Sequence, residues 1–156
     1  IPLMNLLSNS DKNIIFSTGM SSIKEIDSAI NILKQDSSKI GILHCISSYP
    51  TPDYSCRLSN IKFLNDRYSG YTVGYSDHSK GINIPVHAVA SGAKIIEKHF
   101  KLNNDHECVD KTVSIGQDDF TNMVNAIKNV EKIFGVPEFG IRSEEKEIVQ
   151  YRRTNI

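Results

Sequence analysis

Two histidines stand near the ends of short apolar segments, where imidazole side chains could hold a divalent cation. His78 closes the segment Gly-Tyr-Ser-Asp-His, and His99 comes one residue before the end of Lys-Ile-Ile-Glu-Lys-His-Phe. If both segments are neighbouring strands about 4.8 Å apart, the two imidazoles can lean together around a metal. A single histidine at a strand end is typically a hydrogen-bonded residue, but the pair, with polar groups beside it, favours a metal site.

Alternation along a strand places further polar side chains beside these histidines. Successive side chains point to opposite faces, so Ser76 shares a face with His78 and Glu97 shares a face with His99. Glu97 is therefore a candidate for a carboxylate close to the metal. Lys98 points to the other face, where it could pair with a phosphate or with a helix carboxylate.

The sequence predicts that these segments belong to a unit of strand and helix that occurs four times. Expected strands cover residues 13–17, 40–44, 71–75 and 94–100, and expected helices cover 22–33, 58–68, 84–93 and 114–134. Capping-box patterns mark two helix starts, Ser22 with Glu25 and Ser114 with Gln117. Residues 2–7 are typical of the tail of a further helix. Short connections force the strands to run parallel, because the chain must return to the same end of the sheet each time.

Polar side chains at the carboxyl end of every expected strand favour a closed (β/α)₈ barrel over an open doubly wound sheet, since barrel active sites lie at that end. The residues concerned are Ser17, Ser47 with Tyr49, Ser76 with His78, and Glu97 with His99. A barrel needs eight units and about 250 residues. Four units in 156 residues therefore predict half a barrel, and a chain that begins with Ile1 rather than methionine agrees with a fragment of a longer protein.

Composition predicts a soluble protein with a single core. Hydrophobic residues make up 39% of the chain, and 18 basic side chains balance 18 acidic ones. Without a basic stripe or a long apolar run, nucleic acid and membranes are poor candidates as partners. The three cysteines, Cys45, Cys56 and Cys108, show neither paired spacing nor a metal-ligand pattern, which favours a reducing compartment and a cytoplasmic location.

Several other polar residues give weaker signals. Ser17 and Thr18 precede the helix that starts near Ser22, so their hydroxyls and free backbone amides could hold a phosphate, although such residues are usually caps. The segment Ser-Thr-Gly-Met lacks the glycine spacing of a nucleotide-binding turn. The remaining histidines, His44, His87 and His106, are interpreted as strand-end, helix-surface and loop residues.

Four motifs, in this order along the chain, resemble the sialic acid synthase family, which includes the synthases of N-acetylneuraminic, legionaminic and pseudaminic acids. They are Phe-Ser-Thr-Gly-Met at 16–20, His-Cys-Ile-Ser-Ser-Tyr-Pro-Thr-Pro at 44–52, Gly-Tyr-Ser-Asp-His at 74–78 and Glu-Lys-His-Phe at 97–100. The resemblance implies that residues 1–140 are the C-terminal half of a synthase barrel, with strands five to eight. Residues 141–156 resemble the start of a linker toward an antifreeze-like domain.

The resemblance also implies an activity and a set of site residues. Family members condense phosphoenolpyruvate with N-acetylmannosamine or a related N-acetylated aminosugar to give a nonulosonic acid and phosphate. They act as homodimers with a divalent metal, usually Mn²⁺, with Mg²⁺ or Co²⁺ as alternatives. The implied metal ligands are His78 and His99, the implied substrate contacts are Ser17, Ser47, Tyr49 and Ser76, and the implied catalytic carboxylates are Asp110 and Glu97.

Two departures from the family pattern and two rival functions accompany this interpretation. Ser47 stands where some members have asparagine, and the segment 103–108 before Asp110 departs from the usual glycine-proline pattern.

One rival is another phosphoenolpyruvate-condensing or aldolase-type barrel, which would normally present a Schiff-base lysine or a cysteine metal ligand at a strand end. The other rival is a non-catalytic module that binds sugars on the same fold.

Overall fold

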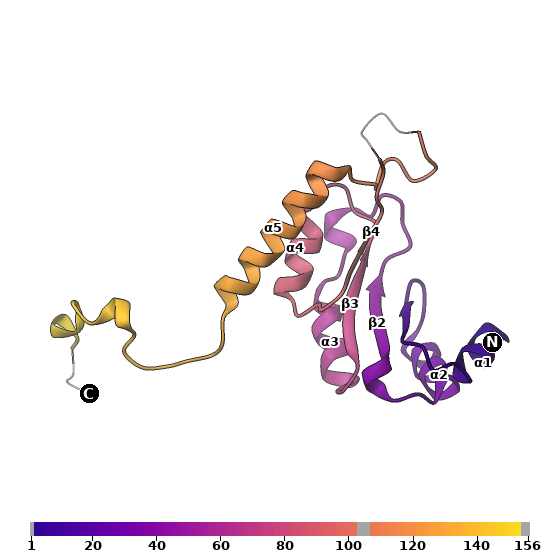
Figure 1. Ribbon diagram of the computed structural model, residues 1–156, viewed down its shortest axis with the longest axis horizontal. Helices are drawn as coiled ribbons and strands as arrows, with labels where there is room; N and C mark the ends of the chain where they lie inside the picture. Colours follow the sequence, from indigo (N-terminus) through magenta and orange to yellow (C-terminus); the bar gives the residue numbers. More distant parts are fainter. Residues whose placement is uncertain (1, 103–106, 154–156) are drawn as a thin grey trace.

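A sheet of four parallel strands forms the centre of the computed structural model, which describes residues 2–102 and 107–153 (Figure 1). The strands are β1 (Ile14–Ser17), β2 (Ile40–Cys45), β3 (Thr72–Asp77) and β4 (Ile96–Lys98), and they follow one another in space in chain order. The four predicted strands and their parallel direction are confirmed. The result is an α/β fold whose sheet corresponds to half of a barrel.

One helix connects each pair of successive strands, α1 precedes β1, and α5 follows β4. Their bounds are α1 (Pro2–Ser8), α2 (Ile23–Leu33), α3 (Ser59–Arg67), α4 (Asn83–Ala90) and α5 (Gln117–Phe134). Short 3₁₀ turns cover Ser37–Lys39, Asp53–Ser55, Ser143–Glu145 and Val149–Tyr151. Each predicted helix is present within a few residues of its expected bounds.

The hydrophobic core lies between the helices and one face of the sheet. Strand residues such as Ile42 and Val73 pack there against helix residues such as Ile61, and all three are fully buried. The other face is the one that would point into a barrel, and it is partly open, with Ile15 55% exposed. Alternation along each strand therefore separates an apolar face under the helices from a face that is available for polar chemistry.

The two predicted capping boxes have different outcomes. The Ser22 hydroxyl accepts a hydrogen bond from the backbone of Glu25, and the Glu25 carboxylate accepts one from the backbone of Ser22. The second prediction is wrong, because α5 begins at Gln117 after Gly116. Ser114 is buried instead, and its hydroxyl donates to the carbonyl of Asp110 at 2.7 Å. The backbone stays extended at this point, since Ile115 bridges to Phe100 in parallel pairing before the helix can start.

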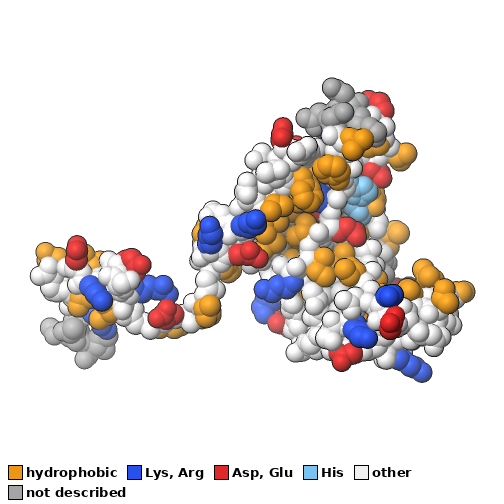
Figure 2. All heavy atoms as spheres, in the orientation of Figure 1, with side chains coloured by type: hydrophobic (Ala, Val, Ile, Leu, Met, Phe, Trp, Pro, Cys, Tyr) orange, Lys and Arg blue, Asp and Glu red, His pale blue; other side chains and the backbone are white. Residues whose placement is uncertain are grey.

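The chain after α5 runs away from the sheet in an extended path with the two last 3₁₀ turns (Figure 1). Residues 136–148 are exposed along their whole length. The predicted linker and its boundary at residue 140 stay predictions. On the face shown in Figure 2, apolar side chains gather at the surface along α5 and beside it. At the end of α5, Ile133 and Phe134 are 72% and 65% exposed. No helix in residues 2–102 and 107–153 is long and apolar enough to span a membrane.

Candidate functional site

The two candidate ligand histidines come together at the carboxyl edge of the sheet. His78 directly follows β3 and His99 directly follows β4, and their ring centroids lie 5.3 Å apart at an interplanar angle of 65°. The predicted convergence of the two imidazoles is therefore confirmed. It depends on the parallel register, in which Ser76 faces Glu97 and Asp77 faces Lys98, so that the next residue of each strand is a histidine.

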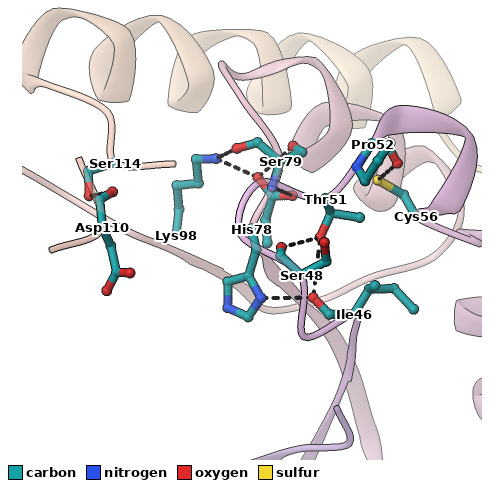
Figure 3. Close-up of polar contacts among 11 residues, drawn as sticks. Ile46, Ser48, Thr51, Pro52, Cys56, His78, Ser79, Lys98, Asp110 and Ser114 are labelled. Carbon is teal, nitrogen blue, oxygen red and sulfur yellow. Dashed lines mark hydrogen bonds and ion pairs between the residues drawn. The ribbon is translucent and has the colours of Figure 1, made fainter. Parts of the chain in front are cut away.

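Hydrogen bonds fix the ring of His78. Its Nδ1 lies 2.9 Å from the carbonyl oxygen of Ile46, and its Nε2 lies 2.9 Å from the hydroxyl of Tyr49. Because a carbonyl can only accept, Nδ1 carries the proton and the lone pair is on Nε2, where the Tyr49 hydroxyl donates. The ring of Tyr49 also stacks on His78, with centroids 4.0 Å apart. Figure 3 shows the His78 ring turned toward Ile46.

Tyr49 and Asp110 complete the surroundings of His99. The Tyr49 ring meets the His99 ring edge-on, with centroids 5.7 Å apart. Asp110 places Oδ2 3.6 Å from Nδ1 of His99, and both side chains are partly exposed. The backbone of His99 is held as well, since its carbonyl accepts a hydrogen bond from the amide of Ile115 at 2.9 Å. Asp110, which the family resemblance implies as a catalytic carboxylate, thus lies beside His99.

Ser76 and Glu97 form a second polar pair next to the histidines. They face each other across β3 and β4, and the Ser76 hydroxyl donates to Oε1 of Glu97 at 2.6 Å. Ser76 is buried whereas Glu97 is exposed. The Glu97 carboxylate is therefore accessible to a ligand at the surface, and the Ser76 hydroxyl is less accessible. Cys45 lies in the same row opposite Ser76, with its Sγ 3.9 Å from Nδ1 of His78. Burial raises the pKa of this thiol, which keeps it neutral and unreactive.

Ser17 and Ser47 lie farther along the same edge. Ser17 ends β1, roughly 10 Å from β3 at the usual strand spacing, and both serines are exposed. Ser47 lies close to Gly19 in the loop after β1. A Cβ added to Gly19 would lie 2.2 Å from the Ser47 hydroxyl. Thr18 is buried, and its hydroxyl donates to the carbonyl of Leu43 at 2.9 Å, so that hydroxyl stabilises the strand end.

The imidazoles of His78 and His99 and the nearby carboxylate of Asp110 are donors of the kinds that could hold a divalent cation. The lone pair of His78 is on Nε2, where the Tyr49 hydroxyl donates to it, while Nδ1 donates to a backbone carbonyl, as is usual for a metal-binding histidine. No group of three or more His, Cys, Asp or Glu side chains in the described part of the chain forms a complete metal cage. The two imidazoles and the nearby carboxylate would therefore need further ligands to complete the coordination of a cation.

Lys98 lies on the opposite side of the sheet from the histidines. Its ammonium donates to Oδ2 of Asp77 at 2.7 Å and to the carbonyl of Ser79 at 2.5 Å. The suggested helix carboxylate is wrong, because the strand register places Asp77 of β3 directly opposite Lys98, and the suggested phosphate contact stays a prediction. This buried pair was missed by sequence reasoning. A signal existed, since the residues of opposite charge occupy the same position, one before each histidine.

The other histidines match their predicted structural roles where the structure describes them. His44 is buried on the core side of β2, and its Nε2 donates to the carbonyl of Cys56 at 2.8 Å. Burial lowers the pKa of His44, although the hydrogen bonds to backbone carbonyls act in the opposite direction. His87 is exposed on α4, where Nδ1 donates to the carbonyl of Asn83. His106 and most of the divergent segment 103–108 lie outside the described residues.

Comparisons with known proteins agree over almost the whole chain. The NeuB family model matches residues 1–138. A protein of Methanocaldococcus jannaschii, named uncharacterized protein MJ1065, is 44% identical over 98% of this chain and 46% of its own length. The N,N'-diacetyllegionaminic acid synthase of Campylobacter jejuni is 34% identical over 99% of this chain and 47% of its own length. The chain thus spans about half the length of the curated relatives it matches.

Solved structures give the same result. The crystal structure of an N-acetylneuraminic acid synthetase from Leptospira borgpetersenii, in complex with citrate, superposes with a TM-score of 0.89 and 37% sequence identity. The match covers 98% of this chain and 53% of the Leptospira chain. A spore coat polysaccharide biosynthesis protein E from Chromobacterium violaceum superposes with a TM-score of 0.82 and 28% identity. With the family model, the relatives and the fold in agreement, the chain belongs to the NeuB family of sialic acid synthases.

Proposed function

We propose that this chain is the C-terminal half of a (β/α)₈ barrel, and that the whole protein condenses phosphoenolpyruvate with N-acetylmannosamine or a related N-acetylated aminosugar. The products are a nonulosonic acid and inorganic phosphate. The observation that carries the proposal is the cluster of His78, His99 and Tyr49 beside two carboxylates at the carboxyl edge of the sheet. Relatives named as nonulosonic acid synthases support the same reaction class.

His78 and His99 would hold the divalent cation, most simply Mn²⁺, with Mg²⁺ and Co²⁺ as alternatives. A bound cation supplies Lewis-acid chemistry by polarising the sugar aldehyde toward attack by C3 of phosphoenolpyruvate. Two observations support this role: Nε2 of His78 carries a lone pair that a cation could take over from the Tyr49 hydroxyl, and Asp110 lies 3.6 Å from His99. We propose that Asp110 binds the sugar or handles a proton near the aldehyde oxygen.

The remaining site residues bind substrate or hold a proton. Ser76 and Ser17 are proposed to hold the phosphate and carboxylate of phosphoenolpyruvate, while Ser47 and Tyr49 line the same pocket. Glu97 accepts a hydrogen bond from Ser76 at 2.6 Å and is exposed, so it can exchange a proton with a ligand that reaches Ser76. Replacing Ser17 or Ser76 by alanine removes a hydrogen bond to a charged ligand, which is worth about 1.5–3 kcal/mol of phosphoenolpyruvate affinity. The affinity for the aminosugar should change less.

The decisive experiment is product analysis of the full-length protein with phosphoenolpyruvate, Mn²⁺ and a panel of aminosugars. We expect a nine-carbon acid by mass spectrometry and one phosphate released per product. His78→Ala and His99→Ala should lose activity and Mn²⁺ binding, whereas His87→Ala, a matched change of an exposed helix histidine, should lose neither. A His78→Ala variant that turns over like the parent would sink the site assignment.

The two rival functions make different predictions in the same assay. An aldolase-type barrel with a Schiff-base lysine would be trapped on its substrate by borohydride, and phosphate would not be released. A sugar-binding module would bind the aminosugar without turnover under any metal condition. We further propose a homodimer for the full-length protein, which sedimentation would test, and a cytoplasmic location, which fractionation would test.

A further inference from the structure

The last residue pair between β3 and β4, Asp77 and Lys98, forms a buried ion pair. Asp77 and Lys98 are Cα partners at the end of this ladder, and the next residue of each strand is a histidine of the proposed site. The Lys98 side chain is 1% exposed and that of Asp77 is 0% exposed. Neither group can touch a substrate on the other side of the sheet, so any role in the reaction must pass through neighbouring residues.

The ammonium of Lys98 holds the backbone on both sides of His78. It donates to the carboxylate of Asp77, which precedes His78, and to the carbonyl of Ser79, which follows it. Asp77 also accepts hydrogen bonds from the Ser79 amide and hydroxyl, each at 3.0 Å. Lys98 itself is joined by one peptide bond to His99. A single side chain therefore ties the backbone of one imidazole to that of the other.

The side chains of Asp77 and Lys98 point to the opposite face of the sheet from the two imidazoles, although each residue is adjacent in the chain to one of the histidines. In Figure 3 the Lys98 ammonium points toward Ser79 and the helix layer, while the His78 ring points away from it toward Ile46. A buried ion pair in general adds little net stability over apolar residues of the same size, because taking two charges out of water is costly. For this pair we therefore consider the geometry that it enforces rather than the stability that it adds.

We propose that Lys98, together with Asp77, is a positioning residue that sets the separation and orientation of the imidazoles of His78 and His99. The inference rests on the proposed function for its consequence, since a fixed imidazole pair matters because it would bind the cation. Two residues on the core side of the sheet thus determine the geometry of the two imidazoles on the other side.

The test uses the full-length protein with the double substitution Asp77→Asn and Lys98→Met. Asparagine keeps an acceptor for the Ser79 amide, and methionine keeps the unbranched shape of lysine, so the bridge is removed without leaving a buried charge. The control is Asp27→Asn with Arg67→Met, which removes a partly exposed ion pair with a 2.7 Å separation between α2 and α3. Urea unfolding shows whether each variant retains a cooperative fold.

Two readouts decide the outcome. The first is the nuclear Overhauser effect between the rings of His78 and His99 in metal-free protein labelled at histidine, and the second is Mn²⁺ affinity by calorimetry. We expect the bridge variant to lose the contact between the rings and to bind Mn²⁺ about 10- to 100-fold more weakly, while the control changes neither. An unchanged ring contact together with unchanged Mn²⁺ affinity would overturn the inference.

The ring contact keeps the two proposals separable. If the parent protein binds no Mn²⁺, the proposed metal site fails, and the ring contact alone decides the positioning role. If the double variant does not fold, Asp77→Asn alone keeps the bond from the Ser79 amide at Oδ1 but replaces Oδ2 by an NH₂ group, so the bond from the Lys98 ammonium is lost. That single variant must then weaken the ring contact, and an unaltered contact counts against the inference.

Discussion

Replacing Tyr49 by phenylalanine should tighten the binding of Mn²⁺ to the full-length protein when no substrate is present. The Tyr49 hydroxyl lies 2.9 Å from Nε2 of His78, the nitrogen that holds the lone pair. A cation that binds this nitrogen must displace the hydroxyl. Phenylalanine keeps the ring that stacks on His78 at 4.0 Å and removes only the competing hydrogen bond.

The size of the effect follows from the environment of that hydrogen bond. A neutral hydrogen bond contributes about 0.5–1.5 kcal/mol net. Tyr49 is 51% exposed, so water replaces part of the lost interaction and the contribution belongs to the lower part of this range. About 0.5–1 kcal/mol corresponds to a two- to fivefold lower Kd for Mn²⁺. If Tyr49 also contacts substrate, the same variant should bind the aminosugar or phosphoenolpyruvate more weakly.

Calorimetric titration with Mn²⁺ measures this change directly. Tyr54→Phe is the matched control, because it removes the same hydroxyl group at a position away from the histidines. Tyr54 is 84% exposed in the 3₁₀ turn Asp53–Ser55. Its Kd should equal that of the parent. Weaker Mn²⁺ binding by Tyr49→Phe would refute the competition and would show that the hydroxyl supports the cation site.

Two further predictions concern the fold that carries the site. Gly74→Ala should lower the free energy of unfolding by about 1–3 kcal/mol, because its Cβ would lie 2.5 Å from the carbonyl oxygen of Ile95. Gly41→Ala meets only side chains, at 3.1 Å, and should cost less in the same urea titration. The pKa of His44 is lowered in the folded state, so the unfolded state binds the proton at a higher pH. The free energy of unfolding therefore has its full value above pH 6.5, the pKa of His44 in the unfolded state. As the pH drops below 6.5, the free energy of unfolding decreases by up to about 1.4 kcal/mol per pH unit. His44→Gln keeps a donor for Cys56 and should remove this slope, and an identical slope would contradict the prediction.

The sequence by itself determined the repeated unit, the parallel sheet and the identity of the residues at its carboxyl edge. Alternation in strands and helical spacing are local properties, and they placed Ser76, His78, Glu97 and His99 on the polar face before any contact was known. The same local logic failed at Ser114. A capping-box pattern is satisfied only if the backbone starts a helix there, and pairing of Ile115 with Phe100 keeps that backbone extended.

Only the tertiary structure decided how the site is held. The register of β3 against β4 placed Asp77 opposite Lys98, and parity alone could not show which partner a buried ammonium would find. The loop after β2 brought Tyr49 back over His78, a contact between residues 29 apart in the chain. Such contacts depend on the packing of separate elements, so no periodicity in the sequence encodes them. Residue types and spacing therefore specified which groups could do chemistry, and the packing of strand ends and loops specified their geometry.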